Sequence, residues 1–90
     1  MLAYIEDEML FSENHIRTLA EARINEKAVV KELTAEGAAR RRFLDLGIVR
    51  DTEVTPLFKS PFGDPVAFLI RGTVIALRLA DCKTIIITEN

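Results

Sequence analysis

The sequence has 90 residues, 49% of them hydrophobic, and a formal net charge of −2 at pH 7. This length fits one domain with one compact core, and the charge disfavours binding to nucleic acid, because domains that bind phosphates are usually basic. The single cysteine, Cys82, excludes an internal disulfide and is typical of a reducing compartment.

Residues 1–18 differ from the rest of the chain because they mix acidic residues with scattered apolar ones. We expect an N-terminal extension here, either frayed or packed as a short helix, followed by a domain over residues 19–90. The acids Glu6, Asp7 and Glu8 are not typical of a secretory signal, and no apolar run approaches the roughly 20 residues that cross a bilayer. We therefore expect a cytoplasmic protein that does not insert into a membrane.

Five short segments rich in β-branched residues follow, and each is expected to form a strand. They are residues 27–33, 53–59, 66–70, 74–78 and 84–88. Turn residues separate these segments at close spacing, which favours a small, strongly bent barrel. Pro56 removes a backbone donor from the second segment, so we expect that position at a sheet edge or a bulge.

One main helix is expected between the first two strands, over about residues 38–46. Ala39, Phe43 and Leu46 recur at i, i+4 and i+7, which places an apolar stripe on one helix face. Gly47 stands where the chain must leave the last turn, so we expect it to have a positive φ. The residues expected in the core are Phe43, Leu46, Val30, Val54, Leu77, Ile85 and Ile87.

Several short motifs occur in a defined order along residues 19–88. They are Leu19, Arg41-Arg42-Phe43, Leu46-Gly47-Ile48, Val54, Gly63-Asp64-Pro65, Arg71-Gly72, Ala76-Leu77-Arg78 and Ile85-Ile86-Ile87. Their order and spacing together resemble the FeoA family of small cytosolic proteins associated with bacterial ferrous iron transport. Where that family commonly has glycine, this chain has Asn25 and Asp51, two residue types that tolerate the left-handed backbone region.

The resemblance implies a mainly β fold, a small SH3-like β-barrel of about five strands with one main helix inserted. It also implies an accessory protein that binds the cytosolic part of a FeoB-type membrane iron transporter. The alternative is a metal-responsive regulatory domain, because a related barrel forms the C-terminal domain of some iron-dependent repressors.

Arg40, Arg41, Arg42 and Arg50 form the only dense positive patch of the sequence. Any one of these arginines is most simply a solvated residue on a helix face, with Arg41 and Asp45 paired at i, i+4. The patch as a whole is equally well explained as a docking surface for carboxylate or phosphate groups. The candidate partner contacts on the helix are Arg40, Arg41 and Asp45.

The turn over residues 60–65 places Phe62 between two prolines. A phenylalanine in such a turn usually packs back under it. In an SH3-like barrel, however, a loop at this place borders the peptide-binding groove, and an exposed aromatic there would serve recognition. Phe62 and Asp64 are therefore further candidate contacts with a partner.

The sequence shows no recognisable catalytic or metal-binding constellation. His15, Cys82 and two methionines are the only soft ligand types, and no CxxC or HxxxH spacing occurs. A histidine-based nucleophile pair would have to use His15, and the four glycines are isolated instead of forming a phosphate loop. We expect no enzyme activity, no cofactor and no dedicated metal site, with Cys82 acting as a small hydrophobe.

Overall fold

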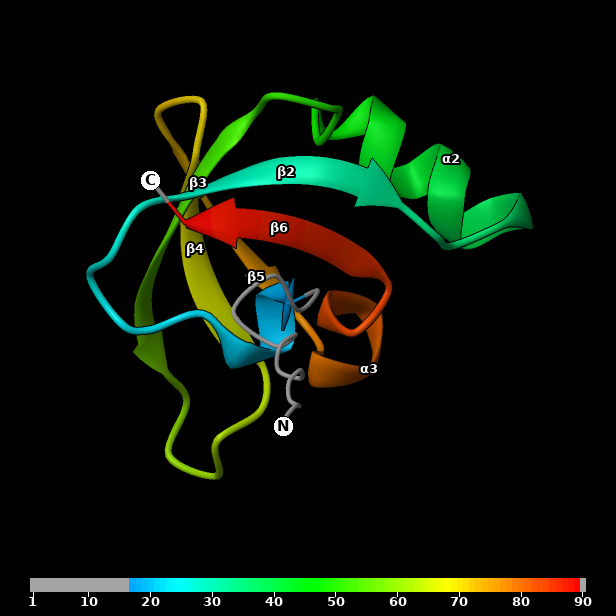
Figure 1. The fold of residues 1–90 in the computed structure, drawn as a ribbon. Helices are drawn as coiled ribbons and strands as arrows, with labels where there is room; N and C mark the ends of the chain where they lie inside the picture. Colours follow the sequence, from blue (N-terminus) through cyan, green and yellow to red (C-terminus); the bar gives the residue numbers. More distant parts are fainter. Residues whose placement is uncertain (1–16, 90) are drawn as a thin grey trace, which may run out of the picture.

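The computed structural model describes residues 17–89, so the expected N-terminal extension lies almost entirely outside the described residues (Figure 1). The described part contains six strands, two α-helices and one 3-10 helix. In chain order they are β1 (Arg17–Thr18), η2 (Leu19–Glu21), β2 (Ala28–Leu33), α2 (Gly37–Asp45), β3 (Glu53–Lys59), β4 (Val66–Ile70), β5 (Thr73–Leu77), α3 (Leu79–Cys82) and β6 (Ile85–Glu89).

The strands form one antiparallel sheet in the order β1-β6-β2-β3-β4-β5. The first residues of β2 pair with β3, whereas β6 pairs along almost the whole of β2, with a register shift between Val30 and Glu32. Because β2 pairs with both β3 and β6, the sheet bends at β2. In Figure 1, β2 and β6 therefore cross in front of β3, β4 and β5. The expected mainly β, SH3-like architecture with one main inserted helix is confirmed.

The strand bounds follow the sequence prediction closely. β3 and β4 have the predicted bounds, and β2, β5 and β6 are displaced by one residue at one or both ends. The pairing of β3 with β4 shifts register between Pro56 and Phe58, so the expected bulge at Pro56 is confirmed. The prediction missed β1, because a strand of two residues shows no alternation of apolar and polar side chains.

The core contains six of the seven residues expected there, including Phe43, which is fully buried. The seventh, Leu46, is 37% exposed, so its predicted burial is wrong. Leu46 is the C-cap of α2, and the turn at Gly47 sends Ile48 into the core in its place, with no exposed area.

The end of α2 is fixed by a Schellman motif. Gly47 has φ 85°, as expected, and its N–H donates to the carbonyl of Leu44 at 3.0 Å. The N–H of Ile48 donates to the carbonyl of Phe43 at 2.9 Å, and both of these side chains are buried. The helix therefore cannot rotate about its axis without taking Phe43 out of the core.

Candidate protein-docking face

The arginines of α2 have different surroundings. Arg40 donates from Nη1 to the carbonyl oxygen of Leu33 at 2.9 Å, and Arg42 forms an ion pair with Asp81 of α3. Arg41 and Asp45 are exposed and form no ion pair or hydrogen bond with any other side chain among residues 17–89, so the expected pair between them is wrong.

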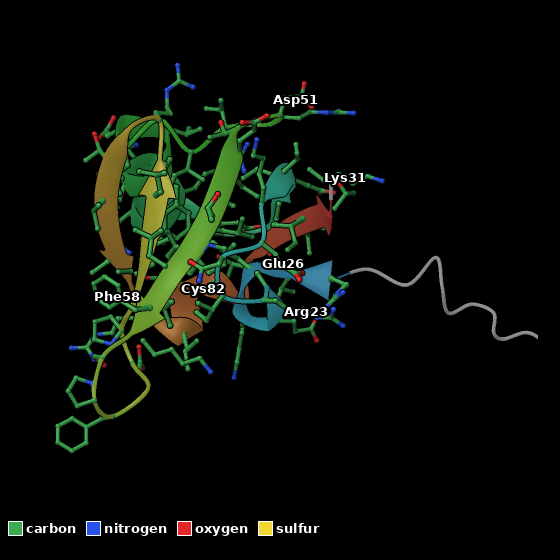
Figure 2. The ribbon with its side chains drawn as sticks, turned by 90° about the vertical axis from the view of Figure 1, so that its left-hand side faces the viewer. Arg23, Glu26, Lys31, Asp51, Phe58 and Cys82 are labelled. Carbon is green, nitrogen blue, oxygen red and sulfur yellow. The ribbon has the colours of Figure 1, made fainter. Side chains whose placement is uncertain are left out.

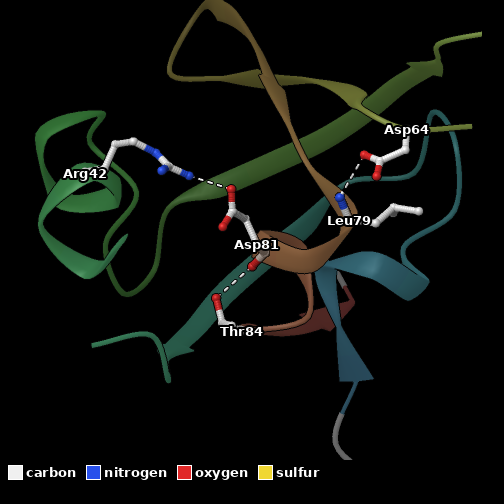
Figure 3. Close-up of polar contacts among 5 residues, drawn as sticks. All are labelled: Arg42, Asp64, Leu79, Asp81 and Thr84. Atoms are coloured by element: carbon white, nitrogen blue, oxygen red, sulfur yellow. Dashed lines mark hydrogen bonds and ion pairs between the residues drawn. The ribbon is translucent and has the colours of Figure 1, made fainter. Parts of the chain in front are cut away.

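The short helix α3 joins the inserted helix to the β3–β4 loop (Figure 3). On one side its Asp81 accepts from Arg42, and on the other the N–H of Leu79 donates to Asp64 Oδ1 at 3.0 Å. The backbone carbonyl of Asp81 also accepts from the hydroxyl of Thr84 at 2.7 Å. One carboxylate oxygen of Asp64 is thus engaged within the domain, which gives this residue a structural role that sequence reasoning missed.

A groove of about 600 Å³ lies between β2 and α2. Its lining combines two half-exposed apolar side chains with several charged ones; the residues are Lys31, Glu32, Leu33, Arg40, Leu44, Val49 and Arg50. The sequence pointed to Arg40 and Arg50 but missed Leu44, because it lies off the apolar stripe of the helix. It also missed Lys31, which is separated from the arginine cluster in the sequence.

The second predicted contact region is the β3–β4 loop. Phe62 is 96% exposed, so it does not pack under its own turn, and Phe58 at the end of β3 is 59% exposed. Figure 2 shows Phe58 on the outer side of the molecule, at the end of β3 that leads into this loop. The loop follows the end of β3, whereas α2 precedes β3 in the chain, and the two lie at opposite ends of the molecule in Figure 1.

The chemistry of Cys82 is that of a buried thiol. It is fully buried inside the domain (Figure 2), and burial raises its pKa from 9.0 to about 12, with the carboxylates of Asp81 and Asp64 adding to the shift. Within residues 17–89 no group of three or more His, Cys, Asp or Glu side chains is placed to hold a metal ion. No helix in the same part of the chain is long and apolar enough to cross a membrane.

The bent sheet and the inserted helix define a small SH3-like domain, which carries a basic surface with exposed apolar side chains. The sequence profile of the FeoA domain matches residues 17–89. The chain therefore belongs to the FeoA family.

Solved structures agree with this assignment. The FeoA-like protein from Clostridium acetobutylicum is 36% identical, with a TM-score of 0.76 over 82% of this chain and 86% of that one. The FeoA protein from Chlorobium tepidum is 32% identical, with a TM-score of 0.76 over 81% of this chain and 70% of that one. The FeoA of Stenotrophomonas maltophilia, solved as a zinc complex, is 32% identical, with a TM-score of 0.71 over 80% of this chain and 89% of that one.

A manganese-dependent transcriptional repressor also resembles the domain, with a TM-score of 0.74 over 83% of this chain and 42% of that one. At 20% identity this likeness shows a shared fold alone. A comparison with curated proteins gave no match.

Proposed function

We propose that this protein is a non-catalytic, cytosolic accessory of ferrous iron uptake that binds the cytosolic part of a FeoB-type transporter. The observation that carries the proposal is the FeoA match over residues 17–89, which leaves little of the chain outside the family domain. The relative from Stenotrophomonas maltophilia is described as a candidate activating factor of bacterial ferrous iron transport, and we extend that role to this chain.

The outer face of α2 is the proposed docking surface. Arg41 and Asp45 are exposed there and have no side-chain partner among the described residues, so a partner can engage them without breaking a contact inside the domain. Arg40 retains four N–H donors beyond the one that Leu33 uses. A guanidinium suits carboxylate groups in particular, because it can donate two parallel hydrogen bonds.

The β3–β4 loop is proposed as a second contact, with Phe62 as an aromatic anchor. Aromatic residues are enriched at interfaces because they bury a large area at a small cost in conformational entropy. Because the loop and α2 lie at opposite ends of the molecule in Figure 1, one partner reaches both only with an extended surface. Asp64 supports this loop through its hydrogen bond to Leu79, and its second carboxylate oxygen remains available to a partner.

The proposal is tested by titrating the full chain with the purified cytosolic region of the transporter encoded in the same genome. Arg41→Glu should weaken binding about tenfold, and wild-type binding should weaken as salt rises, because exposed charge contacts are screened. Arg23→Glu is the matched control, since Arg23 is exposed and lies on the far side of the molecule from α2 in Figure 2. Equal binding by the two variants would exclude the face of α2, and no binding by the wild type would overturn the proposal itself.

A further inference from the structure

We propose that residues 1–16 of this chain dock into the groove between β2 and α2 of the same molecule. The groove is open to solvent, and its described lining comes from β2, α2 and the connection that follows α2. Charge, apolar character and reach all favour this segment as the occupant, and none of the three depends on binding to a transporter.

Charge is divided unequally along the chain. All twelve Lys and Arg residues lie in residues 17–90, together with ten of the fourteen acidic residues, so this part carries a formal charge of +2. Residues 1–16 contain Glu6, Asp7, Glu8 and Glu13 and no Lys or Arg, and these side chains carry −4. The near-neutral total therefore hides an acidic segment attached to a basic domain, which favours their association.

The groove offers positive charge and apolar surface together. Lys31, Arg40 and Arg50 line it against a single acidic residue, Glu32. Lys31 and Arg50 are exposed and have no ion-pair partner among residues 17–89. Two cations near each other repel, and an acidic occupant would relieve that repulsion.

Leu44 and Val49 supply the apolar part of the groove, with 43% and 38% of their area exposed. Residues 1–16 match this combination, because Glu6-Asp7-Glu8 is followed directly by Met9-Leu10-Phe11. An acidic run next to an apolar run can satisfy the cations and cover Leu44 and Val49 in one contact. Covering these side chains removes apolar area from water, which favours docking.

The strand register brings the start of the domain close to the groove. Arg17 of β1 pairs with Ile87 of β6, and Ile87 pairs with Val30 of β2. Arg17 is therefore two strand spacings from Val30, about 10 Å, and Val30 directly precedes Lys31 in the groove lining. Sixteen extended residues can span about 50 Å, so reach does not limit the contact.

Covalent attachment makes even a weak contact sufficient. A segment joined by a short linker has an effective concentration of the order of millimolar at a nearby site, so an intrinsic Kd of about 0.1 mM would leave roughly nine-tenths of the molecules docked. The occupied groove includes Arg40 of the proposed docking face, so the segment would compete with the transporter. This regulatory consequence rests on the proposed function, whereas docking itself does not.

Tyr4 provides a direct probe, because it is the only tyrosine and the chain has no tryptophan. Its fluorescence therefore reports on residues 1–16 within the intact protein, and quenching by acrylamide measures its exposure. We expect the Lys31→Glu/Arg50→Glu variant to raise the quenching constant about twofold over wild type. The same rise should occur in wild type at 1 M salt, where the screening length is about 3 Å.

Lys59→Glu/Arg78→Glu is the matched control, because it changes net charge equally at two exposed residues that do not line the groove. Acrylamide should quench its Tyr4 fluorescence to the same extent as in wild type.

Adding Glu6→Lys and Glu8→Lys to the groove variant restores opposite charges in the segment and the groove. This variant should again protect Tyr4 from acrylamide. Protection that a hundredfold dilution abolishes would assign the groove to a second copy of the chain and overturn the proposal. Equal quenching in wild type and the groove variant would also overturn it.

Discussion

Gly47→Ala is expected to destabilise the domain more than Gly63→Ala, although both glycines have φ 85°. A side chain at this φ costs roughly 1–2 kcal/mol, and alanine returns about 0.4–1 kcal/mol by restricting the unfolded chain. Nothing lies within 4 Å of the Cβ that Gly63→Ala adds, so its net cost should be about 1 kcal/mol.

The Cβ added at Gly47 would lie 2.9 Å from Arg71 Cδ and 3.4 Å from its Nε. The Arg71 side chain must therefore shift, and a displacement of about 30° from its staggered rotamer adds about 0.5–1.5 kcal/mol to the strain at φ 85°. We expect a total near 2 kcal/mol for Gly47→Ala, or a fall in Tm of about 8–16 °C for a domain of this size.

Urea unfolding of both variants, each also made in an Arg71→Ala background, measures this difference as a double-mutant cycle. Removing the Arg71 side chain should bring the cost of Gly47→Ala down to that of Gly63→Ala. The cost of Gly63→Ala should not change. Equal costs for the two glycines in the wild-type background would refute the expectation that the Arg71 side chain limits the space beside Gly47.

Three further predictions concern burial and capping. Phe43→Ala should cost roughly 3–5 kcal/mol in urea unfolding, because Phe43 is fully buried, whereas Phe62→Ala, at a 96% exposed position, should leave the free energy of unfolding nearly unchanged. Cys82 should resist thiol reagents at pH 8. Because the pKa of its thiol is higher in the folded than in the unfolded chain, its contribution to stability should be complete below pH 9 and lost as pH rises toward 12. Cys82→Ala should remove this dependence of the free energy of unfolding on pH. Asp64→Ala should cost about 1 kcal/mol by leaving the N–H of Leu79 without its acceptor, and Asp64→Asn, which keeps a side-chain oxygen, should recover most of this loss.

Local patterns predicted most of the secondary structure. Runs of β-branched residues located β3 and β4, and a glycine after an apolar stripe located the end of α2, because both signals lie within a few residues of sequence. The same stripe misplaced Leu46. A helical period assigns Leu46 to the buried face only if the helix continues, and the turn at Gly47 instead directs Ile48 inward.

The docking face was predicted less completely, because its parts come from separate segments. The sequence indicated an i, i+4 pair on the helix, whereas Arg42 pairs with Asp81, which is 39 residues away. Lys31 and Leu44 meet in one groove only because β2 lies beside α2. Contacts of this kind depend on the tertiary fold, so no local period or spacing reveals them.

The central claim is that the exposed face of α2 binds the cytosolic region of a FeoB-type transporter. The most direct test is an NMR titration of the isotopically labelled full chain with that region, followed by the backbone amide signals. We expect the largest shifts at Arg41, Asp45 and their neighbours in α2, with smaller ones at Phe62. Shifts confined to β1 and β6, or no shifts at all, would contradict it.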